Sequence, residues 1–125
     1  MSVVVPQNPK DDAYLVGQTG LSSWQGPWFD ASLCHELGFT VAWTAVAATN
    51  GTLYIEGTDD PDKGALNVVP LTISTSHGTW PTVAAIAGNA MVRVSNPPHF
   101  IRLGYTRIAG GGAAQFKAFC HGRSL

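Results

Sequence analysis

Hydrophobic and polar residues alternate along the middle of the chain. Between residues 39 and 47 every second position is hydrophobic, and Thr40, Ala42 and Thr44 stand between those positions. A period of two is the repeat of a β-strand that buries one face, and β-branched and aromatic residues favour strands. The pattern therefore predicts a strand with an inward row of side chains. That row is Phe39, Val41, Trp43, Ala45 and Ala47.

The same alternation predicts further short strands. They cover residues 52–56, 66–74, 83–87, 89–94, 100–108 and 114–121. Residues 83–87 also fit a helical turn, but the neighbouring segments favour a strand. Pro70 makes its segment an edge or bulged strand, because proline lacks the N–H that a central strand donates. The predicted inward side chains are Leu53, Ile55, Ile101, Leu103, Tyr105, Phe116, Ala118 and Cys120.

Turn-forming residues separate these strands. Asn50-Gly51 is a strong hairpin signal, and the glycines at 110–112 indicate a second hairpin turn. Residues 58–64 form an aspartate-rich turn, and residues 76–81 are predicted as loop. Roughly seven or eight short strands at this spacing are typical of an all-β protein. The chain is therefore predicted to be an antiparallel β-sandwich that resembles a jelly roll.

Residues 1–27 lack a sustained period and contain several Pro and Gly. They are predicted to form an irregular, extended N-terminal arm, with at most a short strand at 14–16, ahead of a sandwich domain at 28–125. The apolar run Val3-Val4-Val5 is either a strand that lies on a partner chain or a frayed terminus, and the partner is favoured. The candidate partner-binding residues are Val3, Val4, Val5, Tyr14, Leu15, Trp24 and Trp28.

Three of the four tryptophans have two interpretations. Trp24, Trp28 and Trp80 stand beside Gly or Pro or in irregular segments, where a ring can stack on a sugar or anchor an interface. Alternatively they cap the open ends of the sandwich. Arg102 and Arg107 are expected to face away from the core, where they protect an edge or meet an acidic partner.

Composition and charge narrow the function further. Only 12% of the 125 residues are charged, about half the usual ~25%. The net charge of −1 creates no field that would attract nucleic acid or a membrane surface. All eight acids precede residue 63 and five of the seven bases follow it, so copies either associate head to tail or mix these charges by interleaving strands. No signal peptide or membrane span is predicted.

The residue types that carry chemistry lack catalytic or metal-binding spacing. The pairs Cys34-His35 and Cys120-His121 place adjacent residues on opposite faces of a strand, and zinc spacings are absent. The aspartates at 59–62 lack a calcium loop, and no nucleophile elbow or phosphate-binding loop occurs. We expect a non-enzymatic protein without metal or cofactor. Cys34 and Cys120 are either two buried thiols or a disulfide, and the thiols are favoured.

Two parts of the chain resemble small structural proteins of tailed bacteriophages. Residues 38–44 followed by 51–60 are similar to a recurring strand and Gly-x-Leu-x-hydrophobic-Glu-Gly segment, with Thr58-Asp59-Asp60 where those proteins have Ser-Asn-Asp. Residues 99–106, with the glycines at 110–112 and the strand that follows, resemble their closing Arg-hydrophobic-x-Tyr-Thr hairpin. The resemblance covers about residues 28–122.

This resemblance implies a capsid decoration (cement) protein with a jelly-roll fold. Such a protein would bind the major capsid protein, brace neighbouring subunits as a homo-oligomer and contact them through its arm. It would be made in the host cytoplasm and would reside on the capsid surface of the virion. The alternative is a carbohydrate-binding module of a phage tail or fibre, in which tryptophans bind a glycan. A tail or baseplate component is a neighbouring possibility.

Overall fold

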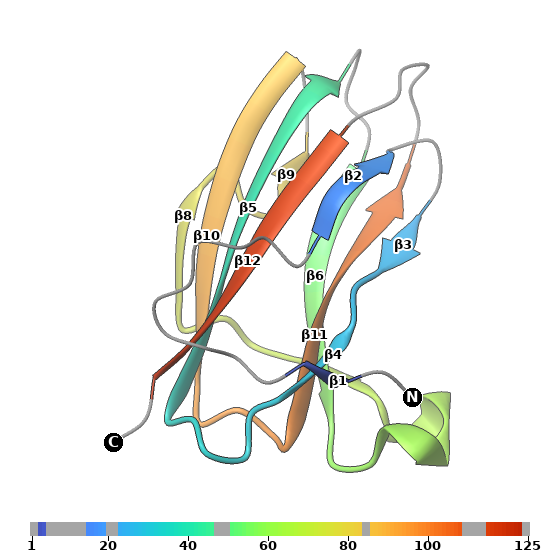
Figure 1. The fold of residues 1–125 in the computed structure, drawn as a ribbon, viewed down its shortest axis with the longest axis vertical. Helices are drawn as coiled ribbons and strands as arrows, with labels where there is room; N and C mark the ends of the chain where they lie inside the picture. Colours follow the sequence, from blue (N-terminus) through green and yellow to red (C-terminus); the bar gives the residue numbers. More distant parts are fainter. Residues whose placement is uncertain are drawn as a thin grey trace.

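The computed structural model describes residues 3–4, 15–19, 23–46, 51–83, 86–108 and 115–123. These residues form two β-sheets that pack face to face (Figure 1). One sheet, sheet A, contains β1 (Val3–Val4), β3 (Trp24–Gln25), β4 (Trp28–Asp30), β6 (Gly51–Thr58), β7 (Val69–Pro70), β9 (Thr82–Val83) and β11 (Phe100–Arg107). The other, sheet B, contains β2 (Leu15–Thr19), β5 (Glu36–Val46), β8 (Thr75–Gly78), β10 (Ile86–Ser95) and β12 (Gln115–Arg123).

The strand order is that of a jelly roll, in which a long hairpin is rolled into two sheets. Pairing is nested: β2 pairs with β12, β4 with β11, β5 with β10, and β6 with both β7 and β9. Four further pairs complete the sheets: β5 with β12, β6 with β11, β8 with β10 and β3 with β11. All of these pairs are antiparallel, and only the short β1 pairs in parallel, with β4, among the described strands. The predicted all-β sandwich is confirmed.

The core lies between the sheets and includes the side chains that the alternation predicts, apart from Ala45, whose side chain is not described, and Ala47, which lies outside the described residues. Trp24, Phe29 and Val83, from short strands, also belong to it. Phe39, Val41 and Trp43 of β5 are each at most 2% exposed. The predicted inward residues of β6, β11 and β12 are buried as well. Phe29 of β4 meets Phe39 edge to face with ring centroids 5.6 Å apart, so aromatic packing joins the two sheets.

Both predicted hairpins are wrong, because the strands on either side of each turn lie in different sheets. Gly51 begins β6 in sheet A, whereas β5 belongs to sheet B. Likewise β11 and β12, which flank the glycines at 110–112, lie in sheets A and B. The turns themselves (47–50 and 109–114) fall outside the described residues. Strand alternation is the same whether two strands pair side by side or face each other across a core, so the sequence pattern does not separate these cases.

The segment between β6 and β10 also differs from its prediction. Residues 66–74 contain only the two-residue edge strand β7, preceded by two 3₁₀ turns, η1 (Pro61–Lys63) and η2 (Ala65–Asn67). Proline at position 70 limits pairing here, as expected of an edge. Residues 76–78, part of the predicted loop at 76–81, instead belong to the edge strand β8 (Thr75–Gly78), which pairs with β10. This strand is exposed throughout, so no hydrophobic alternation marks it.

The described pieces of residues 1–27 belong to the sheets. β1 pairs with β4, β2 with β12, and β3 with β11. Backbone N–H and C=O groups that approach a sheet edge gain hydrogen bonds by pairing, so these pieces join it despite their irregular sequence.

Candidate functional surfaces

The outer face of sheet B carries a hollow centred on Gly38. Gly38 faces outward between Arg93 of β10 and His121 of β12, its direct neighbours in the register. Because glycine has no side chain, the neighbouring residues surround a space of about 240 Å³. We call it the Gly38 hollow. Its lining residues are Glu36, Gly38, Phe39, Thr40, Met91, Val92, Arg93, His121 and Gly122.

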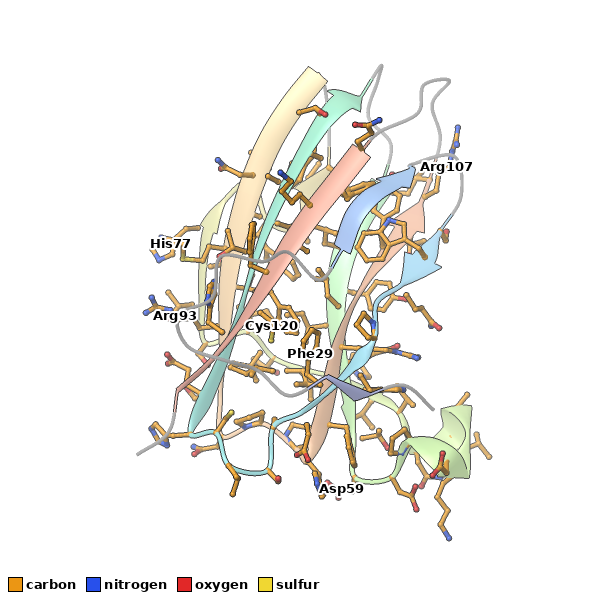
Figure 2. The ribbon with its side chains drawn as sticks, viewed as in Figure 1. Phe29, Asp59, His77, Arg93, Arg107 and Cys120 are labelled. Carbon is orange, nitrogen blue, oxygen red and sulfur yellow. The ribbon has the colours of Figure 1, made fainter. Side chains whose placement is uncertain are left out.

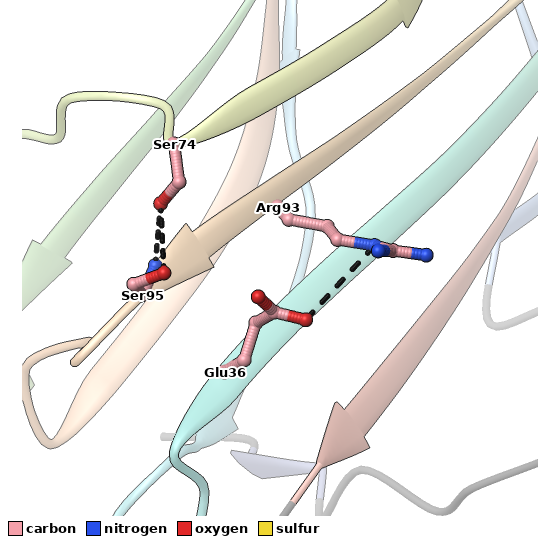
Figure 3. Close-up of polar contacts among 4 residues, drawn as sticks. All are labelled: Glu36, Ser74, Arg93 and Ser95. Atoms are coloured by element: carbon pink, nitrogen blue, oxygen red, sulfur yellow. Dashed lines mark hydrogen bonds and ion pairs between the residues drawn. The ribbon is translucent and has the colours of Figure 1, made fainter.

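The rim of the Gly38 hollow is both apolar and charged. Met91 is 38% exposed, and the Arg93 side chain is 42% exposed. Arg93 Nε lies 4.0 Å from Glu36 Oε1, at the limit of an ion pair (Figure 3). A pair this long and this exposed contributes little to stability, so Arg93 keeps most of its capacity to contact another molecule.

Bases gather on the same outer face. Lys117 of β12 is exposed and lies on the same face of its strand as His121, since the two are an even number of positions apart. His77 of β8 stands opposite Met91 in the register, and Figure 2 shows His77 and Arg93 projecting from the same side of the sandwich. The face is therefore richer in bases than in acids, with Glu36 as its acid among the described side chains.

A pair of serines fixes the edge of sheet B beside this face. The Ser95 backbone N–H donates to Ser74 Oγ over 2.8 Å, and the two hydroxyl oxygens lie 3.1 Å apart (Figure 3). Ser74 N–H also donates to the Arg93 carbonyl. These bonds hold the start of β8 against the end of β10, which carries Arg93.

On the outer face of sheet A, Arg102 forms an ion pair with Glu56 and covers the ring of Trp28. Arg102 Nε donates to Glu56 Oε1 over 2.6 Å, and both side chains are only 17% exposed. The Arg102 guanidinium also lies 4.2 Å from the centroid of the Trp28 ring, a cation–π contact. Arg102 faces away from the core, as predicted, but it meets an acid of its own chain rather than an open edge.

Gly104 is a second position on the outer face of sheet A that another side chain covers. A Cβ at Gly104 would stand 2.2 Å from Tyr54 Cζ, so the Tyr54 ring lies across the glycine. Gly104 is the register neighbour of Tyr54 and of Gln25. The ring fills the space that the absent side chain leaves, and Gly104 is buried.

At one end of sheet A, Asp30 collects hydrogen-bond donors. Its Oδ1 accepts from the Ser32 backbone N–H over 3.0 Å, and His99 Nε2 lies 3.4 Å from the same oxygen. The His99 ring stacks on Phe100 at 4.2 Å. The bonds from Ser32 hold the pKa of Asp30 below its ordinary value, and the charge of His99 acts in the same direction. These contacts stabilise the surface turn that follows β4.

The two cysteines are thiols in this structure. Burial raises the pKa of the Cys120 thiol far above its ordinary value, and the neighbouring Cys34 adds to the rise. A thiol that stays protonated at neutral pH is a poor nucleophile. The favoured interpretation of the sequence, two thiols, agrees with this arrangement, although Cys34 is only half-buried.

Among the predicted partner-binding residues that the structure describes, Val3 and Val4 lie beside Trp28 through the pairing of β1 with β4, whereas Leu15 lies in sheet B. Trp24 is 7% exposed and packs against Tyr105 and Phe116 in the core, and Trp28 is 8% exposed beneath Arg102. Neither ring presents a face on which a sugar could stack in this conformation. The backbones of Val3 and Val4 form β1, and that of Leu15 begins β2. Val5 and Tyr14 lie outside the described residues.

Trp80 and Arg107 complete the predicted set. Trp80 is half-buried and packs against the core cluster, as a residue that caps the sandwich would. Arg107 ends β11 and projects at the opposite end of the sandwich from Asp59 (Figure 2). Within the described part of the chain, no three His, Cys, Asp or Glu side chains lie together as metal ligands, and no helix is long and apolar enough to cross a membrane.

The aspartate-rich turn predicted at residues 58–64 lies between β6 and β7, and it continues through η2 to Asn67. Asp60 caps η1 by accepting from the Asp62 N–H over 3.0 Å, and Thr58 Oγ1 accepts from the Asp60 N–H. The turn protrudes from one end of the sandwich (Figure 1). It carries Leu66, which is 99% exposed. Leu66 was assigned to a strand by its hydrophobic neighbours, and only its place in a protruding turn reveals its exposure.

No protein-family model matches the chain, and no curated protein matches it.

Proposed function

We propose that this chain is a non-enzymatic structural protein of a virion, most specifically a capsid decoration protein that binds the major capsid protein lattice and strengthens the shell. The resemblance to small phage structural proteins, stated from the sequence, supports this role. The jelly-roll fold supports it as well, because viral capsid domains use this fold among several other classes of protein. Fold alone does not decide function, so the surfaces must contribute.

One observation carries the proposal. The segments that resemble phage structural proteins lie far apart in the chain, at 38–44, 51–60, 99–106 and the strand after Gly112. Residues 51–58 pair with 100–107 along all eight positions of β6 and β11, from Phe100 with Thr58 to Arg107 with Gly51. Residues 38–44 lie in β5, which pairs with β12 in sheet B, so the resembling segments form two antiparallel strand pairs, one in each sheet.

The N-terminal strand offers a means of bracing a shell. β1 is held to β4 by only two residue pairs, Val3 with Trp28 and Val4 with Phe29. An edge strand this short is easily exchanged for pairing with the edge of a neighbouring protein. On a lattice, apolar contacts of ~25 cal/mol per Å² repeated at many sites would add up through multivalency.

The direct test is binding to empty shells of the phage that encodes the chain. The full chain is expected to saturate the shell at a fixed ratio to the major capsid protein and to raise the temperature at which shells break open. A chain lacking residues 2–12 should show at least tenfold weaker occupancy. A chain with Val3→Thr, Val4→Thr and Val5→Thr, which keeps the branched shape but adds hydroxyls, should fall between the two.

Two results would overturn the proposal. One is the absence of the protein from purified particles together with no saturable binding to shells. The other is saturable binding on a glycan array, which would favour the carbohydrate-binding alternative. Unchanged occupancy after deletion of residues 2–12 would remove β1 from the bracing role.

A further inference from the structure

Two surfaces at different places on the molecule are complementary in shape and charge. The first is the protruding turn of residues 58–67, which we call the acidic turn. Asp59 and Asp62 are exposed on it, and no hydrogen bond or ion pair among the described residues engages their carboxylates. Leu66 follows and is 99% exposed. The acidic turn is thus a convex element with an exposed leucine and a net charge of −2, from three aspartates and Lys63.

The second surface is the Gly38 hollow, whose lining contains the bases Arg93 and His121 and one acid, Glu36. It is concave, and its ~240 Å³ equals the volume of roughly eight water molecules, ample for one leucine side chain. Met91 supplies an apolar wall, Arg93 supplies a positive charge, and Lys117 adds a second on the same face. The acidic turn and Arg93 lie on different sides of the sandwich, so one copy does not join them within itself (Figure 2).

A fully exposed leucine beside carboxylates costs free energy in water, and so does an open apolar wall beside a guanidinium. Docking one on the other removes both apolar surfaces from water and places opposite charges together. We propose that the acidic turn of one copy of this chain docks into the Gly38 hollow of a second copy, with Leu66 against Met91 and the carboxylates of Asp59 and Asp62 facing Arg93.

The contact is head to tail, since two different surfaces meet. Such a contact leaves an unused turn on one copy and an unused hollow on the other, so it continues into a ring or a row of copies. A single turn in a single hollow buries less than a standard protein interface, so the association in free solution is weak and becomes weaker with added salt. This inference goes beyond the role on a shell and does not depend on it, because the test uses the purified chain alone.

The first experiment is sedimentation velocity over a concentration series up to about 1 mM, at low and at high salt. The full chain is expected to associate with rising concentration, and less so in high salt. Leu66→Glu should weaken association at least tenfold. Leu33→Glu is the matched control: Leu33 is 86% exposed and lies outside the acidic turn and the hollow, so association should stay within twofold.

The second experiment separates head-to-tail contact from a symmetric one. The Leu66→Glu chain keeps an intact hollow, and the Arg93→Glu chain keeps an intact turn. Each alone should remain monomeric, whereas their mixture should form a complex of one copy of each and nothing larger. A chain with Asp59→Lys, Asp62→Lys and Arg93→Glu restores the charge match in reverse and should associate again.

Three results would overturn the inference. The first is a monomer at every concentration. The second is association of the Leu66→Glu chain equal to that of the unaltered chain. The third is association that appears only after deletion of residues 2–12, which would identify this chain's own N-terminal segment, with Asp11 and Asp12, as the occupant of the hollow. Circular dichroism of each variant confirms that the β-sandwich is retained.

Discussion

The outer faces of the two sheets differ in what fills the space beside an outward glycine. Each has an outward glycine in a central strand, Gly104 in sheet A and Gly38 in sheet B. The Tyr54 ring covers Gly104, whereas the nearest atom to a Cβ at Gly38 would be the Val92 carbonyl oxygen at 3.3 Å. The same residue type thus closes one face and leaves a hollow in the other.

The ion pairs of the two faces follow the same division. Arg102 and Glu56 lie 2.6 Å apart and are mostly shielded, and Arg102 also covers Trp28. Arg93 and Glu36 lie 4.0 Å apart, with Arg93 42% exposed. Sheet A thus satisfies its charges within the chain, while sheet B retains a base and an apolar wall for another molecule. This difference is why we propose sheet B, rather than sheet A, as the face that binds another molecule.

The largest difference in unfolding free energy is expected between alanine substitutions of the two glycines. Gly104→Ala places a Cβ inside the Tyr54 ring and should lower the free energy of unfolding by about 2 kcal/mol through overpacking. Gly38→Ala meets only a close carbonyl oxygen and gains from reduced chain entropy, so its change should stay within about 1 kcal/mol. Urea denaturation measures both.

A double-mutant cycle tests the cause of the Gly104 effect. In a Tyr54→Ala background the added methyl has no ring to displace, so Gly104→Ala should cost almost nothing further. An equal cost in both backgrounds would show that Tyr54 does not close this position.

The next largest difference in unfolding free energy is expected between alanine substitutions of the two arginines. Arg102→Ala leaves Glu56 partly shielded without its partner and uncovers Trp28, which should cost about 2 kcal/mol of unfolding free energy. Arg93→Ala removes a long, exposed pair and should cost less than about 0.5 kcal/mol. The fluorescence of Trp28 offers an independent readout for Arg102→Ala. Equal costs for the two variants would contradict the division between the faces.

The sequence predicted the faces of individual strands better than it predicted their partners. The inward rows of β5, β6, β11 and β12 follow from a period of two, because burial selects hydrophobic residues at alternate positions. Partner choice does not follow, since β5 and β6 alternate identically whether they pair or oppose each other. Asn50-Gly51 therefore indicated a hairpin where the chain passes from sheet B to sheet A.

The Gly38 hollow was harder still to predict than the strand partners. The Gly38 hollow requires residues 38, 93 and 121 to be neighbours across three strands, and nothing local in the sequence specifies that register. An outward glycine in a strong strand pattern was the available signal. The sequence pointed instead to tryptophans, because large aromatic residues are common at interfaces. Trp24 and Trp28, however, are buried within this chain.

The smallest expected effect concerns Asp30, which extends the internal charge pairing of sheet A to the end of the sandwich. Hydrogen bonds from Ser32 lower the pKa of Asp30 in the folded state, with a smaller contribution from His99. A carboxyl whose folded pKa is lowered stabilises the protein fully above its unfolded pKa, near 3.9, and loses that contribution as the pH falls through the folded pKa. Asp30→Asn should therefore lower the melting temperature by about 1 °C at pH 6 and leave it unchanged near pH 2. Thermal unfolding of both chains across this range checks the sign. A difference that grew towards acid pH would mean that the Asp30 carboxylate destabilises the folded protein, and sheet A would then not satisfy all of its charges internally.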